Sequence, residues 1–561
     1  MRFGELAEVY AALEATSKRL EKRDIVAELL RRTPSELLDR IPLLVMGRVF
    51  PTYSGKKLEY GEKLFLKAAS SVSGFTVESL ERRIRDLGDI GLAVEACVLE
   101  KPQTSLLTFA GGGGERTLTV TEVHDALCRL AQKSGTDSQS HKAKVIIDLL
   151  SNATALEARF LTRLVLEQMR VGVGEGVMRD AIALAYEVEP AVIERAHALV
   201  NDYGRVAVAA RDGGQEALDA IKLAPGTPLK CMLAQKVPTV EEGLTGAGGT
   251  AAFEYKYDGI RLQVHRDGDT ITLFTRRLEN VTRQFPEIVG AVRDAVRAER
   301  YIIEGELVAV DETGMPLPFQ ELSRRVRRKY DIERMARAIP VILNLFDVLL
   351  VGERTLVELP LRERRQELEG IVDESGRVLL SRTLVTADAD AAREFYEEAL
   401  SQGHEGAMIK NLDAPYQAGS RVGYMYKLKP TLETLDVVVV GAEWGEGRRA
   451  SWFGSLVLAV RDGDGFALVG RMGTGLTDEQ FAHITEELRP LMVQESGREV
   501  TFTPRIVVEV AYEELQQSPT YSSGYALRFP RLVRFREDLG PDDADDVDRL
   551  RRIYTIQKAR G

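Results

Sequence analysis

The sequence is poor in the residues that build disulfide frameworks and zinc sites. Its 561 residues include only three cysteines and six histidines, and the cysteines lie far apart, at Cys97, Cys128 and Cys231. Three separated thiols form neither a disulfide framework nor a four-cysteine zinc site, and they are typical of a reducing cytoplasm. The histidines show no metal-ligand spacing. We therefore expect no zinc site.

Long apolar runs are also missing. No stretch approaches the roughly 18 consecutive apolar residues of a membrane span, and the first twenty residues hold no apolar segment of the kind found in signal peptides. We therefore expect a soluble, cytoplasmic protein that does not enter a membrane. The formal net charge of −11 does not exclude nucleic-acid binding, because phosphate contacts depend on local clusters of lysine and arginine.

What is present is enough apolar sequence for several cores. Hydrophobic residues make up 44% of the chain, and its length favours about three or four domains. Residues 1–222 are predicted to be helical, because apolar side chains recur at helical spacing, as at Leu6, Val9, Tyr10 and Leu13.

The texture changes around residues 224–228, where proline and glycine cluster. From 226 to 430, strand patterns such as 253–257, 260–264 and 270–274 alternate with charged helical segments, which indicates a mixed α/β domain.

Residues 431–561 hold short strands separated by Gly-rich turns, a pattern typical of a small β-barrel. Within the helical region, the four glycines at 111–114 are expected to break the chain between helices. The basic run 324–329 is either a solvated helix face or a phosphate contact.

The segment 254–261, which reads EYKYDGIR, places Lys256 at the end of a predicted strand. A lysine amine has a pKa of about 10.4, so only about one in a thousand is neutral near pH 7. Burial and neighbouring cations are expected to lower the pKa of Lys256 and to expose a nucleophilic lone pair. Arg261 is then placed to reach nucleotide phosphate or ribose. Taken alone, the segment is more often an ordinary half-exposed strand before a turn.

Further short segments follow in a fixed order. They are TRR at 275–277, EGEL at 304–307, LFD at 345–347, EGAMIK at 405–410, YKLKP at 426–430 and RFPRLVRFR at 528–536. Each has an ordinary alternative: an acid at a strand end, a core phenylalanine or a solvated basic face. Their joint order resembles the covalent nucleotidyltransferase superfamily of DNA ligases, RNA ligases and mRNA capping enzymes. The whole chain resembles ATP-dependent DNA ligases of the archaeal and eukaryotic replicative type.

This resemblance implies three domains that encircle duplex DNA. They are an all-α DNA-binding domain over 1–222, an α/β (α+β) nucleotidyltransferase adenylation domain of ATP-grasp-like type over 226–430, and a C-terminal OB-fold β-barrel over 431–561. The implied enzyme seals nicks between a 5′-phosphate and a 3′-hydroxyl in replication, repair and recombination. Lys256 would take AMP from ATP, the AMP would pass to the 5′-phosphate, and the 3′-hydroxyl would displace it.

The resemblance also implies a role for each site residue. Lys256 would attack the α-phosphate of ATP, Glu254 would recognise the adenine edge, and Phe346 would stack on the base. The other nucleotide contacts would be Arg261, Arg276, Glu306, Arg421, Lys427, Lys429 and Arg534. Glu306 and Glu405 would supply oxygen ligands to Mg²⁺. Lys427 and Lys429 would stabilise charge on the α-phosphate and help to lower the pKa of Lys256.

One position departs from the family pattern. The last motif commonly finishes Arg-x-Asp-Lys, whereas Arg536-Glu537-Asp538 is followed here by Leu539. The final cationic contact to pyrophosphate would then pass to Arg534 or Arg536. We expect any consequence to fall on self-adenylylation.

Four related functions remain as alternatives. The large helical region disfavours a GTP-using capping enzyme and an RNA ligase, and three cysteines cannot build the zinc finger of an NAD⁺-dependent ligase. The intact Lys256 disfavours a non-catalytic clamp on DNA ends. For the favoured function the resemblance implies ATP and Mg²⁺ as cofactors, nicked double-stranded DNA as partner, a sliding clamp as a second partner, and a monomer.

Overall fold

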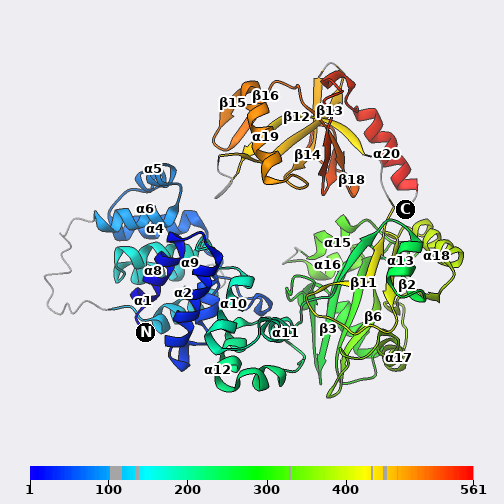
Figure 1. The fold of residues 1–561 in the computed structure, drawn as a ribbon, viewed down its shortest axis with the longest axis horizontal. Coiled ribbons are helices and arrows are strands. Elements are labelled where there is room, and N and C mark those ends of the chain that lie inside the picture. The colour runs from blue at the N-terminus through cyan, green and yellow to red at the C-terminus, as the bar shows by residue number, and fades with distance from the viewer. Residues whose placement is uncertain are drawn as a thin grey trace.

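The computed structural model shows three bodies: helices drawn blue to cyan, sheets drawn green, and a smaller body drawn orange to red (Figure 1). The glycine run 111–114 lies outside the residues that the structure describes. No helix within the described ranges is long and apolar enough to span a bilayer. These ranges are 1–100, 117–132, 138–326, 330–430, 434–445, 451–463 and 465–559.

The first body is helical, as the sequence predicts. Leu6, Tyr10 and Leu13 are fully buried in one core that extends to Leu218, so the apolar face predicted for the first helix is confirmed. Its longer helices are α1 (Phe3–Ala15), α2 (Arg19–Arg32), α3 (Ile41–Val45), α4 (Glu62–Ser73), α5 (Val77–Leu87), α6 (Ile90–Leu99), α7 (Val120–Gln132), α8 (Ser138–Ser151), α9 (Ala155–Val165), α10 (Glu175–Tyr186), α11 (Pro190–Val200) and α12 (Tyr203–Asp219).

Local sequence sets where these helices begin and end. The Thr154 hydroxyl and the Glu157 carboxylate form a capping box that starts α9. The Asp202 carboxylate caps α12. Asn201 ends α11 in the left-handed conformation, with φ +48°, which asparagine tolerates better than most residues. The Asn201 side chain at this corner donates to the Pro228 carbonyl, in the segment that follows α12.

The second body contains two sheets. The first has the order β1-β11-β10-β2-β9 and the second the order β4-β3-β5-β6-β7, with β8 parallel to β6. The strands are β1 (Leu233–Val237), β2 (Ala251–Tyr255), β3 (Ile260–Asp267), β4 (Thr270–Thr275), β5 (Arg300–Ala309), β6 (Val341–Val351), β7 (Arg354–Thr355), β8 (Val378–Leu380), β9 (Thr383–Thr386), β10 (Ala407–Asn411) and β11 (Arg421–Leu428). The predicted strands over 253–257, 260–264 and 270–274 correspond to β2, β3 and β4, although β2 ends at Tyr255.

Helices pack against these sheets, and some of them also supply side chains to the cavity described below. They are α13 (Val240–Gly246), α14 (Pro286–Ala295), α15 (Phe319–Val326), α16 (Ile332–Ala338), α17 (Leu361–Ile371) and α18 (Ala389–Ser401). The first sheet packs into a core around Phe253 and Phe395, and the second into a core around Phe285 and Tyr301. The faces that remain, one from each sheet, enclose the candidate site.

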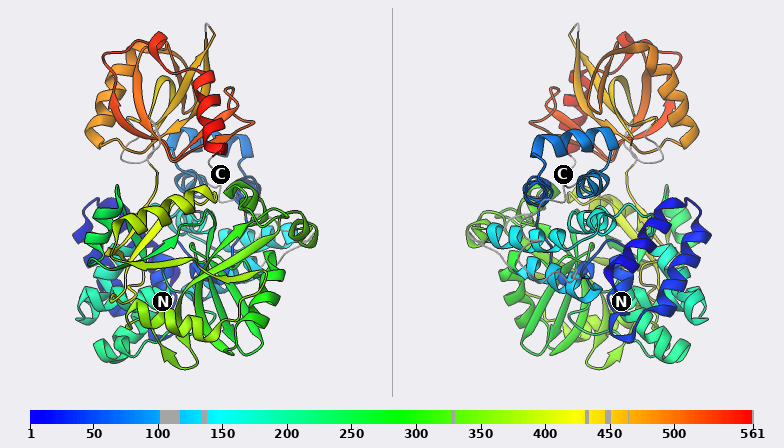
Figure 2. Two further views of the ribbon diagram at one scale, coloured as in Figure 1. Left: turned by 90° about the vertical axis from the view of Figure 1, so that its right-hand side faces the viewer. Right: turned by 90° about the vertical axis from the view of Figure 1, so that its left-hand side faces the viewer.

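The third body stands above the second body in both side views (Figure 2) and contains a bent seven-stranded antiparallel sheet and a separate two-stranded sheet. Its strands are β12 (Leu435–Trp444), β13 (Phe453–Asp462), β14 (Gly465–Met472), β15 (Met492–Ser496), β16 (Glu499–Phe502), β17 (Val507–Ala511), β18 (Glu514–Gln517), β19 (Tyr525–Arg528) and β20 (Arg531–Phe535), with helices α19 (Asp478–Leu488) and α20 (Val547–Ala559).

The closed barrel expected for this body is wrong. The order β14-β13-β12-β16-β15 is extended by β17, which pairs with β12 and β20. No ladder among the described strands joins the two ends, and only the isolated bridge Thr474–Arg531 lies between them. The sheet bends because β12 divides its partners, with Leu435–Val438 paired to β17 and Gly441–Glu443 paired to β16.

Candidate active site

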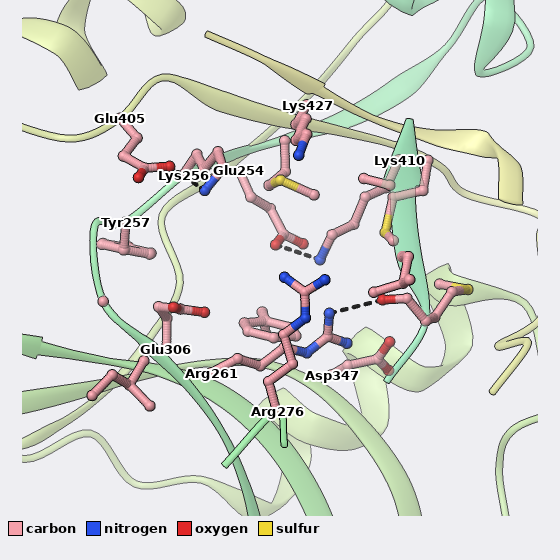
Figure 3. Close-up of a pocket in the computed structure, with 18 of the residues that line it drawn as sticks. Glu254, Lys256, Tyr257, Arg261, Arg276, Glu306, Asp347, Glu405, Lys410 and Lys427 are labelled. Atoms are coloured by element: carbon pink, nitrogen blue, oxygen red, sulfur yellow. Dashed lines mark hydrogen bonds and ion pairs between the residues drawn. The ribbon is translucent and has the colours of Figure 1, made fainter. Parts of the chain in front are cut away.

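A cavity of about 900 Å³ lies between the two sheets of the second body. The first sheet supplies Glu254, Lys410 and Lys427, and the second supplies Arg261, Glu306 and Phe346. All of the predicted site residues except Arg534 line this cavity, and Figure 3 shows most of them pointing inward. Its volume and its mixture of apolar and charged walls suit a small organic ligand with negative charge.

Lys256 lies where the chain crosses from the first sheet to the second, between β2 and β3. Gly259 makes this crossover possible, because a Cβ there would lie 2.3 Å from the Leu307 carbonyl oxygen. On the other side, the Lys256 amide donates to the Gly406 carbonyl at 2.9 Å and the Glu405 amide donates to the Lys256 carbonyl at 2.8 Å. The backbone therefore fixes Lys256 and Glu405 side by side.

The side chains of this pair set the charge at the centre of the site. Lys256 Nζ forms an ion pair with Glu405 Oε2, and Lys429 Nζ lies 2.8 Å from the same oxygen. Burial lowers the pKa of Lys256, but the charges of Glu405, Glu306 and Asp258 outweigh burial and raise it above its usual range. The expected lowering of this pKa is therefore wrong, because carboxylates lie closer to Lys256 than the predicted cations do.

Glu405 itself is strongly ionised. Burial opposes its charge, yet Lys256 and Lys429 together lower its pKa to about 2. Lys427, which faces the same cavity, has its pKa lowered by burial and by the charges of Lys429 and Lys256. An excess of cations thus surrounds one carboxylate, which is the environment that a polyphosphate requires.

Two other carboxyls lie beside Lys256, and one of them, Asp258, also has the Arg528 guanidinium 3.8 Å away. Burial raises the pKa of Glu306 to about 7, and burial together with the charge of Glu405 raises the pKa of Asp258 to about 7. A divalent cation would favour their charged forms. No cluster of three or more candidate ligands for a metal ion occurs among the described residues. Mg²⁺ is often held by only one or two carboxylates, together with phosphate oxygens and water.

The other end of the cavity is built around Phe346. This half-buried ring has Lys410 Nζ 4.7 Å from its centroid and the Arg261 guanidinium at 5.2 Å. Lys410 also forms an ion pair of 2.5 Å with Glu254, and both side chains are at least nine-tenths buried. Figure 3 shows this pair facing the cavity. An aromatic face beside a fixed carboxylate is suited to a flat base with an amino group.

Arg261 has two of its nitrogens occupied. Nη2 donates to Glu304 at 2.5 Å and Nη1 donates to the Met232 carbonyl at 2.9 Å. Its buried Nε has no hydrogen-bond partner among the described residues. A buried N–H without a partner is costly, and an oxygen of a bound ligand would satisfy it.

Two further predicted arginines lie at the cavity mouth and are exposed to solvent. Arg276 follows β4, and Arg421 begins β11 and donates to the Ala234 carbonyl at 2.8 Å.

The last motif divides between the cavity and the surface. Arg528 lines the cavity, 3.8 Å from Asp258 and 2.9 Å from Glu514. Arg534, the predicted nucleotide contact, does not line it, because β20 directs this side chain to Glu509 on β17, at 2.6 Å.

Neither proposed replacement for the missing terminal lysine of the motif reaches the cavity. Arg536 pairs with Asp436 and Asp538, and Leu539 packs against a small apolar cluster. Within this motif, the described part of the chain therefore brings Arg528, and the adjoining Phe529, to the site.

Sequence reasoning missed Lys410, Asp258 and Arg528 as members of the site. All three stand inside the segments that were identified, so their position beside predicted residues was the available signal. Of the basic run 324–329, residues 327–329 lie outside the residues that the structure describes, and Arg324 is exposed. Arg325 is buried and pairs with Glu287 at 2.6 Å, so it is not a surface phosphate contact.

Three family models match this chain. Residues 2–183 match "DNA ligase N terminus", residues 231–429 match "ATP dependent DNA ligase domain", and residues 449–539 match "ATP dependent DNA ligase C terminal region". The second match contains the whole set of cavity residues supplied by the two sheets.

Relatives match over the full length of the chain. The DNA ligase of Thermococcus fumicolans is 46% identical over 561 residues, covering 100% of this chain and 99% of its own. A DNA ligase of Methanothermobacter thermautotrophicus is 47% identical over 98% of this chain and 97% of its own. A solved structure described as "Pmar-Lig_Pre." covers 95% of this chain and 99% of its own, with a TM-score of 0.58 and 17% identity, which shows a shared fold alone.

Proposed function

The chain belongs to the ATP-dependent DNA ligases, and we propose that Lys256 is the residue on which it carries AMP. Members of this family consume ATP and seal nicks in DNA through adenylylation, and that is the activity of this enzyme. The observation that carries the assignment is the position of Lys256: it lies in the cavity, between the cations that attract phosphates and the ring that a base would cover.

The proposed first step forms a P–N bond and breaks a P–O bond. The Lys256 ammonium loses a proton to solvent, and the neutral amine attacks the α-phosphorus of ATP and expels pyrophosphate, leaving a lysine–AMP phosphoramidate. Lys427, Lys429 and Arg528 are placed to stabilise negative charge on the phosphates and on the leaving group. Positioning and electrostatics dominate such displacements, and the fixed Lys256–Glu405 backbone pair supplies the positioning.

The proposed nucleotide contacts divide along the cavity. Glu254, held by Lys410, would accept from the adenine amino group, and Phe346 would stack on the ring. Arg261, Arg276 and Arg421 would contact the sugar and the phosphates. Mg²⁺ would be held by Glu306 and Glu405 with phosphate oxygens and water, and when bound it neutralises charge on the phosphates. Arg534 has no place in this scheme.

We further propose domain limits of 1–222, 226–430 and 431–561, supported by the separate apolar cores of the three bodies. Nicked duplex DNA is the substrate of the family. A monomer is proposed because one chain supplies cavity residues from two bodies, including Lys256 and Arg528. A cytoplasmic location is supported by three free cysteines, and a sliding clamp as a second partner rests on the resemblance to replicative ligases.

The test is to incubate the full-length protein with α-labelled ATP and Mg²⁺, denature it, and map the labelled peptide. Label should appear on Lys256, and nicked duplex DNA should remove it as sealed product forms. Lys256→Ala should take no label, whereas Lys236→Ala, an exposed lysine on β1 outside the cavity, should be labelled normally. Label on another residue would refute the assignment, and label from GTP instead of ATP would move the chain to capping chemistry.

A further inference from the structure

The linker between the first two bodies, residues 220–232, is hydrogen-bonded to both of them. On the helical side, the side-chain amide of Asn201 donates to the Pro228 carbonyl at 2.6 Å. The backbone amide of Lys230 donates to the Ala198 carbonyl at 3.0 Å. Lys230 Nζ also pairs with Glu175 at 2.5 Å. The linker is therefore a fixed strap on the helical body and not a free tether.

The opposite edge of the same linker contacts one face of β3. Residues 261, 263 and 265 alternate with the apolar Leu262 and Val264, so the arginine, glutamine and histidine share the face turned away from the core. Gln263 and His265 are nevertheless each only 1% exposed. A buried polar face on a strand requires partners, and the linker supplies them.

Gln263 uses its whole hydrogen-bonding capacity. Its Oε1 accepts from the Leu229 amide at 3.1 Å and lies 3.4 Å from His265 Nε2. Its Nε2 donates to the Leu229 carbonyl at 2.8 Å and to Glu304 Oε1 at 3.0 Å. The Gly226 amide donates to His265 Nδ1 at 3.2 Å, which places the histidine proton on Nε2, toward Gln263.

Glu304 joins this network to the cavity. The side chain is fully buried, and its two oxygens take separate donors: Oε1 takes Gln263 and Oε2 takes Arg261. The Met232 carbonyl, at the end of the linker, accepts from the other terminal nitrogen of Arg261. Arg261 is thus held between Glu304 and the linker, with Nε left for a ligand.

We propose that Gln263 and Glu304 are positioning residues that make the fit of Arg261 to ATP depend on how the linker docks on the helical body. The network runs from Asn201 through Pro228 and Leu229 to Gln263, Glu304 and Arg261. This inference rests on the proposed contact between Arg261 and ATP. It predicts coupling between a helical residue and the nucleotide site, because a displaced linker shifts both the Met232 carbonyl and the partners of Gln263.

The test measures KM for ATP and kcat of self-adenylylation in the full-length enzyme, without DNA. Gln263→Met keeps the volume but leaves Glu304 Oε1 without its donor, so KM should rise about 10-fold with kcat changed by less than about two-fold. Asn201→Gly removes the contact to Pro228 and tolerates the left-handed backbone, and KM should rise about three-fold. Asn152→Gly, which removes another asparagine-to-carbonyl hydrogen bond of the helical body, should leave KM unchanged.

The double variant decides between coupling and two separate defects. If the network couples the helical body to Arg261, the double variant Gln263→Met with Asn201→Gly should raise KM by about 10-fold, no more than Gln263→Met alone. The reason is that both substitutions interrupt the same chain of contacts. An Asn201→Gly enzyme with wild-type KM, or a double variant whose effects multiply to about 30-fold, would overturn the proposal. Failure of the proposed function would differ, because wild-type enzyme would then carry no label on Lys256. Thermal melting of each variant identifies any loss of folding.

Discussion

At the Phe346 end of the cavity, charged side chains are paired within one body: Glu254 with Lys410, and Arg261 with Glu304. At the Lys256 end, the pairs are shared or come from a second body. Glu405 serves Lys256 and Lys429 together, and Arg528 approaches Asp258 from the third body at 3.8 Å. The difference indicates that the surface proposed for the base is built within one body, whereas the surface proposed for the phosphates includes a side chain from a second body.

Removing the nucleophile tests the Lys256 end most severely. Lys256→Ala should lower the rate of lysine–AMP formation by at least about 10⁴-fold, because the variant lacks the amine that would form the P–N bond. The variant should still seal a nick whose 5′-phosphate already carries AMP. Gel assays of both steps on one preparation check this. Loss of sealing in a well-folded variant would mean that Lys256 has a second role.

Breaking a buried pair tests the Phe346 end. Lys410→Met leaves the Glu254 carboxylate buried without a partner, which should cost about 3–5 kcal/mol of the free energy of unfolding. Urea unfolding measures the loss. Lys236→Met, at an exposed lysine of the same sheet, should change stability by less than about 0.5 kcal/mol. Equal effects from the two variants would show that the Phe346 end is not held by its ion pair.

The contribution of the third body is tested by its arginines. Arg528→Ala should lower kcat of self-adenylylation by about 10²-fold, because it removes a cation placed to stabilise the departing pyrophosphate. Arg534→Ala should have a much smaller effect, since its side chain is 62% exposed and paired with Glu509 outside the cavity. Single-turnover labelling compares them. A larger defect in Arg534→Ala would show that the last motif binds ATP in a different arrangement.

The smallest effect concerns pH and the buried network beneath Arg261. Burial lowers the pKa of His265 to about 3, whereas the unfolded chain has a histidine near the usual value. Below that value the unfolded state takes up a proton and the folded state does not, so the stability contributed by neutral His265 is lost as pH falls toward 3. At about pH 5 the wild type should have lost about 2 kcal/mol more than His265→Gln, relative to neutral pH.

Unfolding by urea at both pH values gives that difference. Comparison with the variant is necessary because Glu306 and Asp258 have raised pKa values and respond to pH in the opposite direction. An identical pH dependence in the two proteins would show that His265 is not kept neutral by the fold.

The sequence was sufficient for the parts of the fold that repeat a local pattern. The helical face of Leu6, Tyr10 and Leu13 and the hairpin at Asp267–Gly268 follow from spacing and turn chemistry, and both are present. That the last sheet stays open could not be predicted, because it depends on how strands distant in sequence pair. The alternation of side chains predicts which residues of β12 share a face, but it does not predict that one half of β12 pairs with β17 and the other half with β16.

The site shows the same division. Short motifs located the residues around Lys256, because neighbours in sequence remain neighbours in the cavity. The direction of the Lys256 pKa shift depends on which charge lies nearest, and Glu405 comes from a segment about 150 residues later. Arg528 and Arg534 belong to one motif, yet Arg528, at the end of β19, faces the cavity and Arg534, near the end of β20, does not. Side-chain direction is a tertiary property that a motif does not record.

The two backbone hydrogen bonds between Lys256 and the Glu405–Gly406 turn lie wholly within the second body. Any swing of the third body would carry Arg528 away and leave the Lys256 amine beside the same carboxylate, at the same spacing. The position of the attacking amine therefore depends on the second body alone, whereas the contact proposed for pyrophosphate depends on the third body. If the third body moves away after the first step, the residue proposed to bind pyrophosphate leaves the site, and the lysine–AMP bond in the second body is not disturbed.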